Sequence, residues 1–134
     1  MTEDISRNKA REKYGFKSNL GNNQKGDGYK YRGRGILQLT GRDVYTRFSQ
    51  YYNDYVNPDA DFVTNPGKVA SSLKVAVISG LWYYSHKVMH NVDIGSQTSS
   101  KTITKQINPG AGKAEVHKRK KKFDKVKKNI TDCQ

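Results

Sequence analysis

The stretch from Gly26 to Arg42 reads GDGYKYRGRGILQLTGR, and it decides how the middle of the chain folds. The segment Gly21–Gly35 holds five glycines among asparagines, lysines and aromatic residues, which predicts an ordered loop or a tight series of turns. The sequence then changes to Ile-Leu-Gln-Leu-Thr over Ile36–Thr40, which predicts a short buried segment. We therefore expect a glycine-rich loop that runs directly into the core.

Helical spacing of apolar residues begins directly after this stretch. It spans Gly41–Asn53 and predicts a helix that Thr40 caps with its hydroxyl. A more apolar helix is predicted from Asn65-Pro66 to about Ser85, because Asn suits the N-cap and Pro the first helical position. We expect this second helix to form the core of the protein.

Three shorter patterns complete an all-α prediction with short irregular segments. Helices are expected over Asp4–Lys13, Thr102–Ile107 and Lys113–Lys128. The last of these helices is expected to turn three apolar residues towards the core: Val116, Phe123 and Val126.

Length and composition limit the class of protein. The chain has 134 residues, a length typical of one domain, and its hydrophobic share of 34% is below the usual value. The longest apolar stretch, Val75–Tyr84, is too short to cross a bilayer, and the polar segment Met1–Arg11 predicts no signal peptide. Transmembrane, collagen-like and coiled-coil proteins are thereby excluded. The single cysteine, Cys133, cannot form an internal disulfide.

The net charge of +13 predicts a polyanionic environment: nucleic acid, an anionic membrane surface or an acidic cell-wall polymer. The window Lys113–Lys128 contributes +7 of it, since it holds nine Lys or Arg against Glu115 and Asp124. A solvated helix face and a polyanion-binding face both fit this window. The run Tyr29–Arg34 mixes cations, aromatic rings and glycine, which suits single-stranded nucleic acid. It equally suits a turn whose arginines brace neighbouring carbonyls.

Histidine and glutamate are too few for most metal or nucleophile sites. His86 and His90 stand four residues apart, but Lys87 occupies the place of a metalloprotease glutamate and no third ligand is evident. We expect a surface histidine pair and neither a metal nor a cofactor.

The run Gly26–Arg42, with the preceding Leu20-Gly21-Asn22, resembles the signature of the family 19 glycoside hydrolases, which include plant-type chitinases and many phage endolysins. Three further elements agree in order. They are the Asn65-Pro66 helix with Gly80-Leu81-Trp82-Tyr83-Tyr84, the run Thr104–Asn108, and Arg119 placed four residues before Phe123. The resemblance extends from about Leu20 to Lys128. It implies three segments: a polar one at 1–19, a family 19-like domain at 20–128 and a tail at 129–134.

The resemblance implies a lysozyme-like, all-α fold and an inverting mechanism with two carboxyl groups. Glu12 is then the candidate general base, and Thr40 helps to hold the attacking water. Sugar contacts are implied for four residues, whereas Trp82 is expected to pack in the core. The four residues are Tyr31, Gln38, Asn108 and Arg119.

The general acid of the family lies in a His-Glu motif well upstream of the glycine-rich run, and no such motif occurs here. We therefore expect a domain that is incomplete at its N-terminus, with the acid supplied by an upstream segment or a partner polypeptide. Loss of catalysis is the other explanation.

The function expected is that of a phage-encoded lysin in the host cytoplasm or the virion. It would cleave β-1,4 bonds between N-acetylated sugars of peptidoglycan, or of a chitin-like polysaccharide, without membrane insertion. The alternatives are a non-catalytic cell-wall-binding or virion module and a basic nucleic-acid-binding protein.

Overall fold

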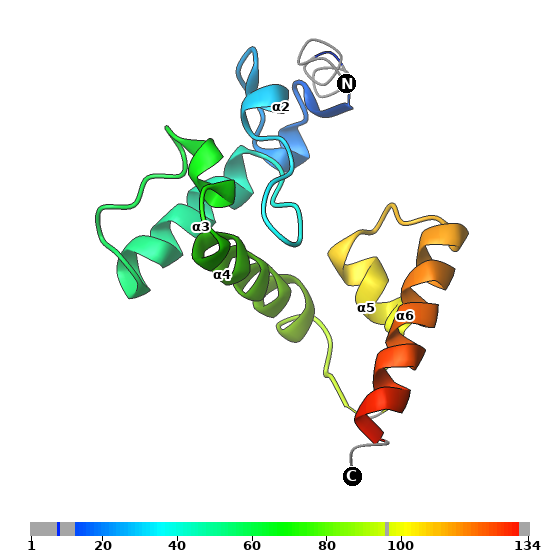
Figure 1. The fold of residues 1–134 in the computed structure, drawn as a ribbon. Helices are drawn as coiled ribbons and strands as arrows, with labels where there is room; N and C mark the ends of the chain where they lie inside the picture. Colours follow the sequence, from blue (N-terminus) through cyan, green and yellow to red (C-terminus); the bar gives the residue numbers. More distant parts are fainter. Residues whose placement is uncertain (1–7, 9–12, 96, 132–134) are drawn as a thin grey trace. The chain divides into compact units, whose positions relative to one another are not determined.

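The computed structural model describes residues 8, 13–95 and 97–131, and within this part it is helical without a β-strand. The all-α prediction is confirmed. The chain forms two compact units, Met1–Tyr83 and Tyr84–Gln134, which are described separately. The helices of the first unit are η1 (Ser18–Leu20), α2 (Asp27–Lys30), α3 (Arg42–Tyr55), η2 (Pro66–Ala70) and α4 (Leu73–Tyr84). The helices of the second unit are η3 (Ser85–Met89), α5 (Ser100–Ile107) and α6 (Lys113–Thr131) (Figure 1).

Helix α3 begins as the apolar spacing predicts, but its N-terminus is capped differently. The N-cap is Gly41, whose φ of 96° and ψ of 147° suit glycine. The predicted cap by Thr40 is wrong, because the Thr40 hydroxyl donates to the carbonyl of Gln38 over 2.8 Å. Asn22 supplies the capping acceptor instead, because its Oδ1 accepts a hydrogen bond from the backbone N–H of Arg42 over 3.0 Å.

The core of the first unit gathers on one face of α3. Val44, Tyr45, Phe48 and Tyr52 recur along this face and are buried. The Phe48 ring stacks on Phe62 at a centroid distance of 5.1 Å. Rings that fill one face in this way dominate the apolar burial of a small unit.

Helix α4 packs against this aromatic face and does not form the core itself, so the prediction of a core helix is wrong. Trp82 is half-buried with its ring centroid 5.4 Å from that of Phe48, which confirms its expected packing role. Leu73 and Leu81, however, are 79% and 66% exposed. The predicted helix is also interrupted, because η2 ends at Ala70 and α4 begins at Leu73.

The segment Ile36–Thr40 is only partly buried, contrary to expectation. Leu39 is fully buried, whereas Ile36 is 59% exposed and Gln38 is also exposed. The reason is that this segment forms a turn that lies against α4. The small residues Ser79 and Gly80 of α4 are buried under this turn and leave little room there for large side chains.

The second unit is built on two helices that lie side by side, α5 and α6 (Figure 1). Ser99 caps α5 by accepting the N–H of Thr102 over 3.2 Å. Phe123 and Val126 of α6 are 44% and 56% exposed, so their predicted burial is wrong. Because α5 has eight residues and α6 nineteen, α5 is about 12 Å long and cannot cover the second half of α6.

In the part of the chain that the structure describes, no helix is long and apolar enough to cross a membrane. The helix expected over Asp4–Lys13 falls almost wholly outside the described residues. The segment boundaries expected at residues 20 and 128 stay predictions.

Candidate functional site

The signature loop, which we define as Gly33–Thr40, is closed by two backbone hydrogen bonds. The N–H of Leu39 donates to the carbonyl of Arg34 over 2.8 Å, and the N–H of Arg34 donates back over 3.2 Å. Gly35 turns the chain with a φ of 75°, and a Cβ there would lie 2.4 Å from Ser79 Oγ. The signature loop therefore rests directly on α4, and only glycine fits at this contact.

Gln38 and Thr40 lie together on this loop. Gln38 has a φ of 56°, a conformation that few residues other than glycine adopt, and its side-chain amide donates to the carbonyl of Gly35 over 3.0 Å. Both side chains border Gly33, where an added Cβ would lie 2.6 Å from Gln38 Oε1 and 3.2 Å from Thr40 Oγ1. Strained backbone that presents a polar, exposed side chain is a feature of ligand sites. The structure thus brings together two residues that the sequence proposed separately.

A buried ion pair fixes both ends of the glycine-rich run. The Asp27 side chain is only 3% exposed and accepts two hydrogen bonds from Arg42, at 2.6 and 3.0 Å. The backbone N–H groups of Asn23 and Gln24 donate to the same carboxylate. Burial by itself raises the pKa of Asp27, but the hydrogen bonds from Arg42 and Gln24 outweigh it and hold the pKa below its usual value. Sequence reasoning missed this pair, because nothing in the sequence links two residues fifteen positions apart.

The two arginines of the run brace backbone carbonyls, as one of the two open interpretations predicted. Arg32 donates to the carbonyl of Tyr29 over 3.0 Å, and Arg34 donates to that of Lys30 over 2.8 Å. Arg34 also donates to the hydroxyl of Tyr45, which in turn donates to the carbonyl of Arg32. Burial raises the pKa of Tyr45, and the neighbouring arginines reduce this effect. These guanidinium groups are therefore structural.

Tyr31 lies inside the first unit and not on its surface. Its side chain is fully buried, and its hydroxyl donates to the carbonyl of Val63 over 3.1 Å. Its ring packs against that of Tyr45 at 5.4 Å, and the Arg42 guanidinium lies 4.9 Å from its centre. A ring without exposed surface has no face to offer a sugar, so the structure gives Tyr31 a role in packing.

Asn22 connects two segments that both carry predicted catalytic residues. It is 1% exposed, and its Nδ2 donates to the carbonyl of Tyr14 over 2.7 Å while its Oδ1 accepts the N–H of Arg42. Tyr14 follows Glu12 by two residues, and Arg42 follows Thr40 by two. Glu12 itself lies outside the described residues. The sequence placed Asn22 in a motif, but only the structure shows what its amide holds.

The other two predicted sugar contacts belong to the second unit. Asn108 is the exposed C-cap of α5, and its Oδ1 accepts the N–H of Gly110 over 3.2 Å. Arg119 is half-buried on α6 and donates to Glu115 over 2.7 Å. This hydrogen bond, followed by the charges of neighbouring cations, lowers the pKa of Glu115. Both residues keep polar groups at the surface of their unit.

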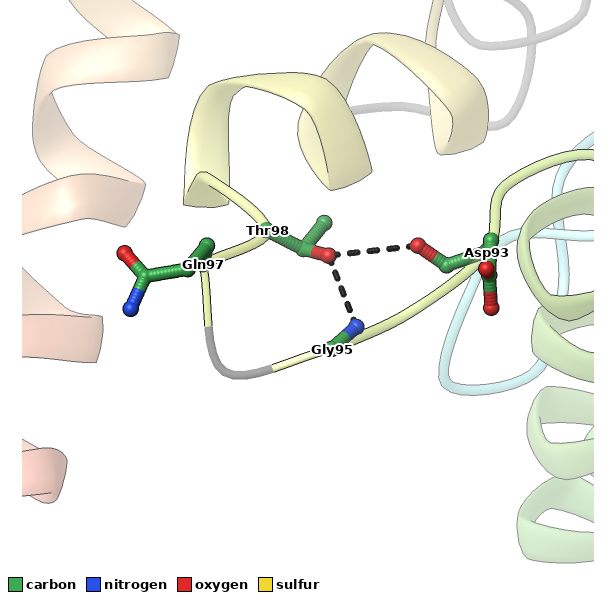
Figure 2. Close-up of a pocket in the computed structure, with 4 residues that line it drawn as sticks. All are labelled: Asp93, Gly95, Gln97 and Thr98. Carbon is green, nitrogen blue, oxygen red and sulfur yellow. Dashed lines mark hydrogen bonds between the residues drawn. The ribbon is translucent and has the colours of Figure 1, made fainter.

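Figure 2 shows a shallow hollow in the loop before α5, lined by Asp93, Gly95, Gln97 and Thr98. The Thr98 hydroxyl accepts the N–H of Gly95 over 2.9 Å and donates to the carbonyl of Asp93. The Thr98 hydroxyl is therefore already hydrogen-bonded to the backbone of its own loop. These hydrogen bonds hold the shape of the loop, and among the described residues that line the hollow the one ionisable group is the carboxylate of Asp93.

The histidine pair lies on one face, as its spacing predicts, with ring centroids 5.7 Å apart. Within the described residues, no group of three or more His, Cys, Asp or Glu side chains is placed to hold a metal ion.

One comparison with known proteins identifies a relative. A curated Haemophilus influenzae protein named "Glycosyl hydrolase family 19 domain-containing protein" is 31% identical over 90 residues. The match covers 67% of this chain and 38% of that protein, so the chain spans well under half of the length of its relative. No family model and no solved structure matches the chain. The identity confirms the resemblance to this family: the chain is related to the family 19 glycosyl hydrolases.

Proposed function

We propose that this chain is the sugar-binding and water-positioning part of a peptidoglycan-degrading glycoside hydrolase of the phage lysin type. The observation that carries the proposal is the pairing of Gln38 and Thr40 on the strained signature loop beside Gly33. The relationship to a family 19 protein supports hydrolysis of a polysaccharide. The net charge of +13 favours an acidic bacterial wall over chitin, which is neutral.

The hydroxyl of Thr40 is suited to orient a water molecule. Its one proton is engaged, because it donates to the carbonyl of Gln38 over 2.8 Å. Towards a water molecule the oxygen can therefore act only as an acceptor. A water molecule that donates one hydrogen bond to Thr40 and another to a general base directs a lone pair towards the anomeric carbon. In an inverting reaction this water attacks from the face opposite the leaving group.

Glu12 is the proposed general base, and the general acid comes from an upstream segment or a partner polypeptide. Gln38 is proposed to contact a sugar of the same polymer. Asn108 and Arg119 are proposed as further sugar contacts, because each holds an exposed or half-exposed polar group through a local hydrogen bond. Preorganised groups of this kind bind a polar ligand with a smaller loss of side-chain entropy.

The direct test measures release of reducing ends from purified peptidoglycan and from chitin. The chain is assayed alone and together with the polypeptide encoded upstream of it. We expect weak or no release from peptidoglycan by the chain alone, because it lacks the general acid, and faster release when the upstream polypeptide is present. Binding to peptidoglycan with no release in either assay contradicts the hydrolase and favours a wall-binding module. Faster release from chitin contradicts the choice of substrate.

Replacement of Thr40 by valine tests the role of the hydroxyl. Thr40→Val keeps the shape of the side chain and removes the acceptor for water, so we expect kcat to fall about tenfold with little change in KM. Thr46→Val is the matched control, since Thr46 is exposed on α3 and its hydroxyl donates to the carbonyl of Arg42 within the same helix. Equal rates for the two variants would show that Thr40 holds no water.

Replacement of Gly33 by alanine tests the position of Gln38. The new Cβ would lie 2.6 Å from Gln38 Oε1, so the amide must move away, which a flexible side chain does at little cost in stability. We expect KM to rise about threefold to tenfold, the effect of losing one hydrogen bond to substrate. A Cβ at Gly67 meets nothing within 4 Å, so Gly67→Ala is the control. If KM is unchanged in Gly33→Ala, Gln38 makes no sugar contact.

A further inference from the structure

The second unit contains a cavity of about 550 Å³ that none of the proposed catalytic or sugar-contacting residues line. Its walls come from α5, from α6 and from the turn that joins them. Five basic residues line it: Lys101, Lys105, Lys113, His117 and Lys120. No Asp or Glu is found among the described residues of the lining. The cavity is therefore suited to an anionic group.

The lysines of the cavity are not equivalent. Lys105 is held in place, because its ammonium donates to the carbonyl of Ala111 over 2.6 Å. Lys120 pairs with Asp124 over 2.5 Å, which partly neutralises it. Lys101 and Lys113 are exposed lining residues, one on α5 and one on α6. Each of the two helices therefore contributes one exposed lysine to the cavity.

The chemistry of the lining is suited to phosphate groups. Lysine is a common phosphate ligand and binds phosphate as a point charge, and four lysines are among the described residues that line the cavity. Ser99 and Ser100 add hydroxyl groups where α5 begins, and the first turn of α5 carries no acidic residue. The N-terminal end of a helix adds a partial positive charge there.

The same lining argues against nucleic acid. Proteins that bind single strands stack the bases on aromatic rings, but no Phe, Tyr or Trp is among the described residues that line the cavity. Ala111, which is buried, and Val116, which is half-buried, supply its apolar surface. Small apolar groups of this kind fit a polyol or sugar unit next to a phosphate.

We propose that the cavity between α5 and α6 binds the phosphate groups of a polyol-phosphate polymer of the cell wall. Such a site would hold the chain on the wall independently of the signature loop. The proposal does not require that the chain hydrolyse anything.

The test measures binding of poly(glycerol phosphate) to the full chain by isothermal titration calorimetry at low salt. In the double variant Lys101→Gln, Lys113→Gln each helix loses one charge from the lining of the cavity, and we expect affinity to fall about tenfold or more. The control variant Lys122→Gln, Lys125→Gln loses the same two charges from exposed positions on α6 that do not line the cavity. Its affinity is expected to stay within about twofold of the unchanged chain.

Equal losses in the two double variants would overturn the site, because the affinity would then follow net charge alone. Absence of binding by the unchanged chain would overturn it as well. Single-stranded DNA that binds more tightly than the polymer, and loses affinity only in Lys101→Gln, Lys113→Gln, would replace the wall polymer with nucleic acid. The calorimetric signal needs no hydrolysis, so a failure to release reducing ends leaves this test intact.

Discussion

Replacement of Arg42 by alanine is expected to lower the free energy of unfolding of the first unit by about 3 kcal/mol, because it leaves the buried carboxylate of Asp27 without its charge partner. The Asp27 side chain is 3% exposed, and Arg42 supplies the only cation that bonds to it among the described residues. The variant also removes the bond from Arg42 to Gln24 Oε1. The expected loss of stability is large for the side chain of Arg42, which is itself 22% exposed.

Urea unfolding followed by tryptophan fluorescence measures this loss directly. Trp82 is the single tryptophan of the chain and lies in the first unit, so the signal reports on the unit that contains the ion pair. Arg47→Ala is the matched control, since Arg47 is an exposed arginine on the same helix. We expect it to change stability by less than about 0.5 kcal/mol. Equal losses in both variants would mean that the ion pair contributes nothing specific.

The same pair predicts how stability depends on pH. The pKa of Asp27 is lower in the folded chain than in the unfolded chain, so its contribution is fully present above the unfolded value, about 3.9. That contribution is lost as the pH falls through the lower, folded pKa. In Arg42→Ala the folded pKa rises, and we expect the loss of stability below about pH 4 to become smaller. An unchanged acid profile would contradict this account.

Replacement of Glu12 by glutamine is expected to slow hydrolysis at least about a hundredfold, the contribution that a general base typically makes. The assignment rests on the resemblance, since Glu12 lies outside the described residues. Asn22 bonds to the carbonyl of Tyr14 and to the N–H of Arg42, and these residues stand two positions after Glu12 and Thr40. One buried side chain thus links the segment of the proposed base to the segment of the proposed water-holding hydroxyl.

The measurement is the initial rate of reducing-end release in whichever assembly proves active. Glu3→Gln is the control, because it removes the same group from another glutamate in the N-terminal segment and leaves the net charge identical. We expect KM to change little in Glu12→Gln, since the role proposed for Glu12 is to activate water and not to bind sugar. A rate equal to that of Glu3→Gln would refute the assignment of the base.

Local patterns in the sequence located two helices well. Apolar spacing located α3, and the run before Asn108 located α5 within two residues of its observed start. These predictions succeed because helical periodicity and end signals act over a few residues. For Arg32 and Arg34 the sequence left two interpretations open, and the structure favours the bracing role, in which each guanidinium reaches a carbonyl three or four residues away.

Predictions that depended on contacts between distant residues were less successful. Thr40 does not cap α3, because Asn22 supplies the accepting oxygen from twenty residues away. Tyr31 was expected by resemblance to contact a sugar, yet its hydroxyl donates to the carbonyl of Val63 and its ring is fully buried. Apolarity alone also chose the wrong core helix, because α3 carries the aromatic face that the rest of the first unit packs against.

By itself, the sequence determined an all-α chain, a glycine-rich run that leads into α3 and a relationship to the family 19 glycosyl hydrolases. These properties are encoded in residues that lie close together along the chain. The tertiary structure alone decided that Asp27 and Arg42 form a buried pair, and that Gly33 leaves room for Gln38 and Thr40. Such arrangements depend on which side chains meet across a fold, and that is set by packing and not by spacing.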